Sequence, residues 1–425
     1  MNTKLPILIA LLLLFFISTH LFGQNYIDHI QQKKFSEALI IIQSQLDDIY
    51  SKRSIEKLIP TTYVAIEKIE EGIDLQKIFS ERKMQPYFIE NNNTLYALHT
   101  NAALCYQNIY KYHEALQHYF QALRFTTIGE KDHTIFYSIA QIFKKINKFN
   151  AYVFYLEEAY EIKPDNYDYS LELSLALSSG KSKKKALFHL NRYIASKGDS
   201  VPPNLYLIAA NCYESIGDYI NAAQQYTLYL NHKPNDYAVL FALGYLAYTK
   251  ISDMKLAYKS FINAIPLFNE NDWVLKGLSY TMLGDIECMD LNYKNGLEHY
   301  LQSIAISENM KKTMDDKKAY IHTINDKINA IKSTLLANKD IALYPQYQTL
   351  MDELGNNQLE LRQLEHEYSK LNAGELSFKI AVANENMMQF DQAIEWYNKT
   401  IAYGVKIRES TKKIEKLQLK ISRGF

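Results

Sequence analysis

Two His-Glu pairs are the first residues in this sequence whose types and spacing could support chemistry. His113-Glu114 and His366-Glu367 match the start of the zinc-hydrolase pattern, in which a second histidine follows one helical turn later. Neither pair is followed by that histidine. His118 lies near His113 in the sequence, but no cysteine or carboxylate completes a ligand set around them. We therefore interpret these histidines as surface or packing residues and predict no metal site.

Motifs for nucleophilic catalysis and phosphate binding are also missing from the sequence. It contains no glycine-rich phosphate loop and no Gly-x-Ser-x-Gly nucleophile elbow. Lys+Arg and Asp+Glu both number 47, so the formal net charge is zero and no general attraction to nucleic acid is expected. We predict a protein that is not an enzyme, holds no cofactor and binds no nucleic acid.

The first residues have the pattern of an export signal. Lys4 precedes an apolar run at residues 5–17, and Gly23 places a small residue before Gln24. Such a sequence is typical of a cleaved signal peptide, which we predict at residues 1–23. An uncleaved membrane anchor is the alternative, although the run is short for a span. We expect an exported chain without a membrane span once processed, periplasmic or secreted, with association to the cell envelope left open.

An internal repeat organises most of the chain. In residues 203–236, one helical face carries Tyr206, Ala209, Ala210 and Tyr213, and after a turn at Gly217 a second face carries Ala222, Tyr226 and Tyr229. Small residues at positions 8 and 20 allow two antiparallel helices to approach closely, and large residues at positions 4, 11 and 24 fill the space around them. The same frame starts at Tyr96, His133, Tyr167, Tyr237, Gly277 and Gly374, and the unit from Tyr237 needs a one-residue insertion.

This pattern resembles the tetratricopeptide repeat, a unit of 34 residues. Two residues depart from it, since Tyr152 replaces the small residue at position 20 and Lys183 replaces the aromatic at position 17. The resemblance implies an all-α fold, a right-handed solenoid of antiparallel helix pairs whose first helices line a concave groove.

The period changes to seven residues between 311 and 372. One run repeats Met314, Ile321, Ile328 and Leu335, and a second repeats Leu354, Leu361 and Tyr368. Two heptad helices joined around residues 340–345 predict an antiparallel helical hairpin inserted into the solenoid. It is either a protruding arm that binds or self-associates, or an enlarged helix pair packed into the stack, which is the interpretation we favour.

These features divide the chain into six parts. We predict the signal peptide at 1–23, a degenerate N-terminal helical region at 24–95, the repeat solenoid at 96–310, the hairpin at 311–372, a last repeat at 374–407 and a capping helix at 408–425. Within the second part, residues 51–95 fit no repeat frame, and we assign no role to them.

The resemblance also implies a function, because related repeats hold a peptide or a helix of a partner protein in the groove. The groove-facing positions here are Thr100, Leu104, Gln107, Asn108, Tyr137, Gln141, Lys144, Lys145, Leu207, Asn211, Glu214, Phe241, Tyr245 and Tyr248. Amides and tyrosines suit a peptide, since amides pair with its backbone and tyrosine offers flat area. We therefore expect an exported, non-catalytic scaffold for a partner protein or peptide. A structural subunit of an envelope secretion or export assembly and an extracytoplasmic sensor module are the alternatives.

Overall fold

The structure, a computed structural model, describes residues 25–51, 92–125, 132–338 and 341–423. These residues contain helices and connecting turns and no β-strand, which confirms the predicted all-α fold class. The chain divides into two compact units, residues 1–201 and 202–425, and each is described by itself. The predicted signal peptide and most of the segment 51–95 lie outside the described residues.

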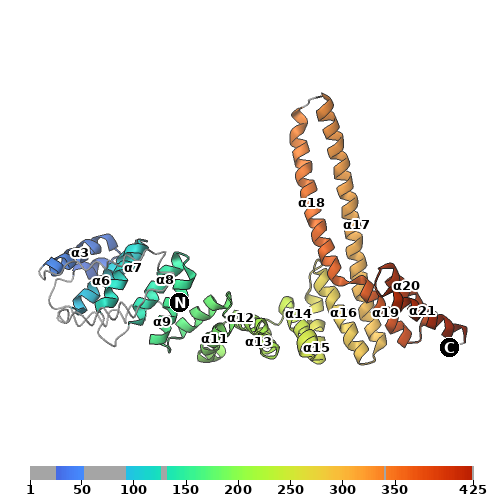
Figure 1. The fold of residues 1–425 in the computed structure, drawn as a ribbon, viewed down its shortest axis with the longest axis horizontal. Coiled ribbons are helices and arrows are strands. Elements are labelled where there is room, and N and C mark those ends of the chain that lie inside the picture. The colour runs from blue at the N-terminus through green and yellow to red at the C-terminus, as the bar shows by residue number, and fades with distance from the viewer. Residues whose placement is uncertain (1–24, 52–91, 126–131, 339–340, 424–425) are drawn as a thin grey trace. The chain divides into compact units, whose positions relative to one another are not determined.

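The first unit consists of helices that pack in consecutive antiparallel pairs (Figure 1). Its elements are α2 (Asn25–Gln31), α3 (Phe35–Ser51), α6 (Asn92–Asn108), α7 (Tyr112–Phe125), α8 (His133–Lys145), α9 (Phe149–Ile162), α10 (Tyr167–Ser178), α11 (Lys183–Lys197) and the 3₁₀ turn η3 (Gly198–Ser200). The tightest contacts join α6 with α7, α8 with α9, and α10 with α11. These are the pairs that the repeat frame predicts.

The second unit continues this arrangement and adds one long hairpin (Figure 1). Its elements are α12 (Pro203–Ser215), α13 (Tyr219–His232), α14 (Tyr237–Leu246), the π-helix η4 (Ala247–Ile251), α15 (Met254–Ala264), η5 (Ile265–Leu267), α16 (Trp273–Met289), α17 (Tyr293–Asn338), η6 (Ile341–Leu343), α18 (Tyr344–Leu371), α19 (Ala373–Asn386), α20 (Phe390–Ala402) and α21 (Ile407–Ser422). A π-helix carries an extra residue per turn, so η4 absorbs the insertion in the unit from Tyr237.

Small residues lie where the helix pairs meet, as the sequence predicts. Position 8 holds Ala103, Ala140, Ser174 and Ala210, and position 20 holds Ala115, Ala186, Ala222 and Ala393, and all eight side chains are fully buried. Tyr152, the exception at position 20, is also buried. Close backbone approach at these points lets the tyrosines and phenylalanines around them pack into the core.

One turn recurs between the two helices of six pairs. Each has a residue of positive φ at repeat position 15, namely Lys33, Tyr110, Asn147, Gly217, Leu291 and Met388. In each pair the next amide N–H donates to the carbonyl five residues before it, at 2.7–2.9 Å. This is the hydrogen bond that ends a helix at a left-handed residue. Only one of the six is glycine, so tertiary packing holds the others in a conformation that costs energy locally.

The predicted hairpin is present, and it forms an arm. Helix α17 has 46 residues, about 69 Å at 1.5 Å per residue, and it passes through the predicted boundary at 310 and 311 without a break. Met314, Ile324 and Ile328 are buried in its seam with α18, which confirms the heptad hairpin. Our preferred interpretation, an enlarged pair packed into the stack, is wrong. The hairpin stands away from the other helices of its unit, and Leu336 and Leu359 are 74% and 64% exposed (Figure 1).

Among the described residues, no helix is both long enough and apolar enough to cross a membrane.

Candidate partner-binding surfaces

The predicted groove residues lie on the first helices of their pairs and fall in both units. In the first unit they are Thr100, Leu104, Gln107, Asn108, Tyr137, Gln141, Lys144 and Lys145, on α6 and α8, which we call the first face. In the second unit they are Leu207, Asn211, Glu214, Phe241, Tyr245 and Tyr248, on α12, α14 and η4, which we call the second face. All fourteen side chains are half-buried or exposed, and four of them, Tyr137, Leu207, Phe241 and Tyr248, also pack against the buried core.

A carboxylate organises the first face. Glu172 on α10 accepts hydrogen bonds from Gln141 Nε2 at 2.9 Å, Lys144 Nζ at 2.6 Å and the Tyr152 hydroxyl at 3.1 Å. Burial would raise the pKa of Glu172, but the hydrogen bonds from Gln141 and Lys144 outweigh it, and the pKa is lowered. The carboxylate is thus ionised at neutral pH and forms an ion pair with Lys144. Lys144 therefore belongs to a structural ion pair and is not a free cation that a partner could bind.

Other polar residues of the first face are also engaged within the chain. Gln107 accepts from the Tyr119 hydroxyl at 2.8 Å, and Asn108 Nδ2 donates to the carbonyl of Leu104 at 2.8 Å. Tyr137 stacks on Tyr169 with ring centroids 4.9 Å apart. A ligand on this face would therefore compete with internal contacts for most of its polar groups.

A larger share of the second face is open to solvent, since three of its six side chains are exposed, against three of eight on the first face. Phe241 and Tyr245 stack with ring centroids 6.0 Å apart on one helix, and Tyr245 is 44% exposed. On the preceding first helix, Asn211 and Glu214 are exposed, and both accept from the Tyr226 hydroxyl, at 3.0 and 2.9 Å. A stacked aromatic pair, an amide and a carboxylate therefore line neighbouring first helices of this unit.

A second carboxylate centre lies beyond this face. Asp285 on α16 accepts from the hydroxyls of Tyr248 at 2.9 Å and Tyr300 at 2.7 Å, and both its oxygens lie 2.7 Å from Lys379 Nζ on α19. The side chain of Asp285 is only 12% exposed. Burial, followed by the charge of Asp285, raises the pKa of Tyr300, so that this phenol stays a hydrogen-bond donor. Tyr248 is thus tied to the neighbouring helix pair.

Sequence reasoning missed both Glu172 and Asp285. One signal could have indicated such contacts, because a tyrosine at position 24 recurs with a polar acceptor in the preceding first helix. The bonded pairs are Tyr119 with Gln107, Tyr226 with Glu214, Tyr300 with Asp285 and Tyr397 with Glu385. In three of the four the acceptor lies 12 residues before the tyrosine.

A histidine pair occupies the core of the first unit. His99 Nδ1 lies 2.9 Å from His118 Nδ1, and His99 Nε2 lies 2.9 Å from the Tyr50 hydroxyl. Burial, together with His118, lowers the pKa of His99 to about 3. Burial also lowers the pKa of His118 to about 4, against the opposing charge of Glu114. Both imidazoles are therefore neutral at pH 7, which fits the interpretation of His118 as a packing residue.

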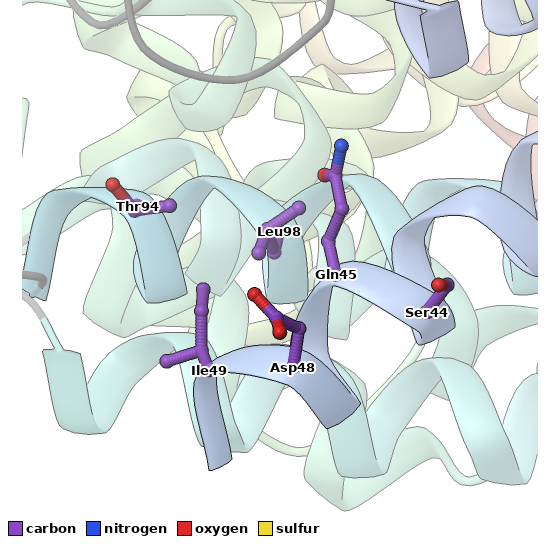
Figure 2. A pocket seen from close by; sticks show the side chains of 6 residues that line it. All are labelled: Ser44, Gln45, Asp48, Ile49, Thr94 and Leu98. Atoms are coloured by element: carbon purple, nitrogen blue, oxygen red, sulfur yellow. The ribbon is translucent and has the colours of Figure 1, made fainter. Parts of the chain in front are cut away.

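The first unit also has a pocket of about 300 Å³ between α3 and α6. Figure 2 shows Ser44, Gln45, Asp48 and Ile49 from α3 and Thr94 and Leu98 from α6 around it. Its lining offers a carboxylate, an amide and two hydroxyl groups but no thiol or imidazole. Across the described parts of the chain, no three His, Cys, Asp or Glu side chains are close enough to hold a metal ion.

The recurring pairs and their common turn define an all-α helical-repeat protein of tetratricopeptide-like helix pairs. No protein-family model and no curated protein sequence matches this chain.

Solved structures that match this chain include the following two. One is the C-terminal part of a TPR repeat-containing protein from Cytophaga hutchinsonii, 12% identical over 69% of this chain and 98% of that chain, with a TM-score of 0.36. Another is MamA from Desulfovibrio magneticus, 16% identical over 42% of this chain and 97% of that chain, with a TM-score of 0.32.

Proposed function

We propose that this protein is an exported, non-catalytic scaffold that binds a partner protein or peptide on the second face. The observation that carries the proposal is the Phe241–Tyr245 stack, in which Tyr245 is 44% exposed, together with the exposed Asn211 and Glu214 on the preceding first helix. Aromatic rings supply flat contact area at low entropic cost, and an adjacent amide can pair with a peptide backbone. Export is proposed from the sequence pattern at residues 1–23.

The second face is a better candidate than the first because it presents an exposed aromatic ring, Tyr245, beside its stacking partner Phe241. Lys144 and Gln141 both donate hydrogen bonds to Glu172, whereas Tyr245 is 44% exposed. A charge reversal at Lys144 would place two carboxylates together and destabilise the first unit. Lys145, which is exposed, is the cleaner position for testing whether the first face takes part.

The test is affinity capture from an envelope extract with the chain lacking residues 1–23. Tyr245→Ala should reduce the captured partner about tenfold or more, since truncating an aromatic hot-spot residue costs about 2 kcal/mol or more. Phe188→Ala is the matched control, because Phe188 is 55% exposed on the second helix α11. Equal capture by the wild type and Tyr245→Ala would contradict binding on the second face.

The exposed arm supports a second candidate, a structural subunit of an envelope assembly that docks through residues 311–372. Replacing the arm by a short linker separates the two. A scaffold that uses the second face keeps its partner after this deletion. A subunit that docks through the arm loses a single stoichiometric complex.

A further inference from the structure

Helix α18 has an outward stripe opposite its seam with α17. At 100° per residue, Tyr344, Gln348, Met351, Gly355, Leu359, Arg362 and His366 fall within one quarter of the helix surface. All seven are exposed, and the large apolar side chains Tyr344, Met351 and Leu359 are 51%, 42% and 64% exposed. The stripe extends over about 33 Å. A single arm therefore exposes a second apolar row that its own fold does not use.

Gly355 lies at the centre of this stripe and has no role within the arm. It is interior to α18, where glycine is a poor helix former, and a Cβ added to it would meet nothing within 4 Å. A glycine between exposed methionine and leucine side chains, one turn before and one turn after it, permits another helix to approach closely at this point. Such an approach explains a residue that the isolated arm does not need.

The stripe is self-complementary about Gly355. Met351 and Leu359 each lie four residues from it, Gln348 and Arg362 seven, and Tyr344 and His366 eleven. In an antiparallel pair of α18 helices with Gly355 facing its copy, methionine therefore meets leucine, glutamine meets arginine and tyrosine meets histidine. Twofold symmetry requires this reciprocity, because one patch must match itself.

The charges on α18 also permit such a pair. The five carboxylates of the helix, Asp352, Glu353, Glu360, Glu365 and Glu367, all lie off the stripe. Arg362 faces an amide and His366 faces a phenol, so no like charges are opposed. The arm length fits as well. Tyr344 begins α18 and lies opposite the copy of His366, so each tip stops near the base of the other arm.

We infer that two copies of this chain associate through their arms, with the α18 stripes antiparallel about Gly355. Each chain of the dimer then contributes one copy of the second face, and the two copies lie at opposite ends of the paired arms.

Cysteine cross-linking of the full processed chain tests the geometry. Gly355→Cys should form a disulfide-linked dimer under mild oxidation, because the two copies meet on the symmetry axis. Gln348→Cys should not, because its two copies lie about 21 Å apart in an antiparallel pair. The wild type, whose own cysteines include the buried Cys105 and Cys212, is the background control. Linkage through Gln348→Cys but not Gly355→Cys would overturn the antiparallel arrangement.

Mass measurement tests the association itself. Light scattering at increasing concentration should give the mass of two chains for the wild type. Met351→Glu/Leu359→Glu should weaken dimerisation on the order of a hundredfold. Mixing that variant with Met351→Lys/Leu359→Lys should restore a dimer of one copy of each. Ala330→Glu, at an exposed position of α17, is the control and should leave the dimer intact. A wild type that stays monomeric at about 100 μM, or a dimer unaffected by the glutamate substitutions, would overturn the proposal.

Discussion

Helix α17 packs in two different ways along its length. Near its start it lies against α16, where a Cβ on Gly284 would meet the ring of Tyr300 and lie 3.0 Å from the carbonyl oxygen of Gly296. Farther along, its contact with α18 uses the long side chains of Ile324 and Ile328. The first contact requires the absence of side chains, and the second requires their presence.

The charged residues compared here are more buried in the repeat than in the arm. In the repeat, Lys379 and Asp285 are 29% and 12% exposed, and two tyrosine hydroxyls complete the group. In the arm, Lys318 and Glu365 lie 3.0 Å apart at 49% and 43% exposure. The repeat therefore depends on specific contacts, whereas the arm depends on a general heptad pattern. We expect substitutions to have larger effects in the repeat.

The largest expected effect comes from filling the close helix contact. Gly284→Leu should destabilise the second unit by at least ~3 kcal/mol, because no rotamer avoids Tyr300 and the facing backbone. Gly355→Ala, in the arm, should instead stabilise its helix by up to ~1 kcal/mol, measured at concentrations where the chain is monomeric. Urea unfolding followed by circular dichroism checks both. Similar effects at the two glycines would remove the distinction between the regions.

The buried carboxylate should give the next largest effect. Asp285→Ala leaves Lys379 and the hydroxyls of Tyr248 and Tyr300 without their acceptor, so we expect a loss of about 3 kcal/mol. Lys318→Ala removes an exposed ion pair of the arm and should cost ~0.5 kcal/mol or less. The same unfolding experiment compares them. An Asp285→Ala protein as stable as Lys318→Ala would show that the buried group is dispensable.

A substitution in the seam of the arm should have the smallest effect on the stability of the repeat. Ile324→Ala removes a side chain that is 1% exposed and should destabilise the arm by about 2 kcal/mol. Hydrogen exchange should then rise in residues 311–371 while α16 and α19 keep their protection. Leu336→Ala, at a 74% exposed position, is the apolar control. Loss of protection in α19 would show that the arm and the repeat unfold together.

The sequence predicts the helix pairs and the arm seam because each depends on residue type alone. A close backbone contact accepts only small side chains, so Ala103, Ala210 and Gly284 mark the pairs in advance. Heptad spacing marks Met314 and Ile328 in the same way. The common turn is harder to predict, because Tyr110, Leu291 and Met388 have left-handed backbone that their residue types do not favour.

The Glu172 centre could not be predicted from spacing within one repeat. Glu172 and its partner Lys144 lie in successive helix pairs, 28 residues apart, and their contact depends on how one pair is placed on the next. Lys144 therefore has the sequence pattern of a free groove cation but forms an internal ion pair. That the hairpin protrudes also follows from packing outside the heptad pattern, since the pattern describes its seam and not its outer faces.

The place where the arm joins the repeat has a consequence for how this protein can vary. Leu371 at the end of α18 lies against Gly277 near the start of α16, and Lys379 reaches Asp285 across 94 residues of chain. Helices α16 and α19, which lie on either side of the arm in the sequence, are thus in direct contact. Seven residues added to each arm helix would keep the seam in register and move the tip outward by about 10 Å. The arm is therefore a spacer whose length is adjustable in fixed steps without rebuilding its base.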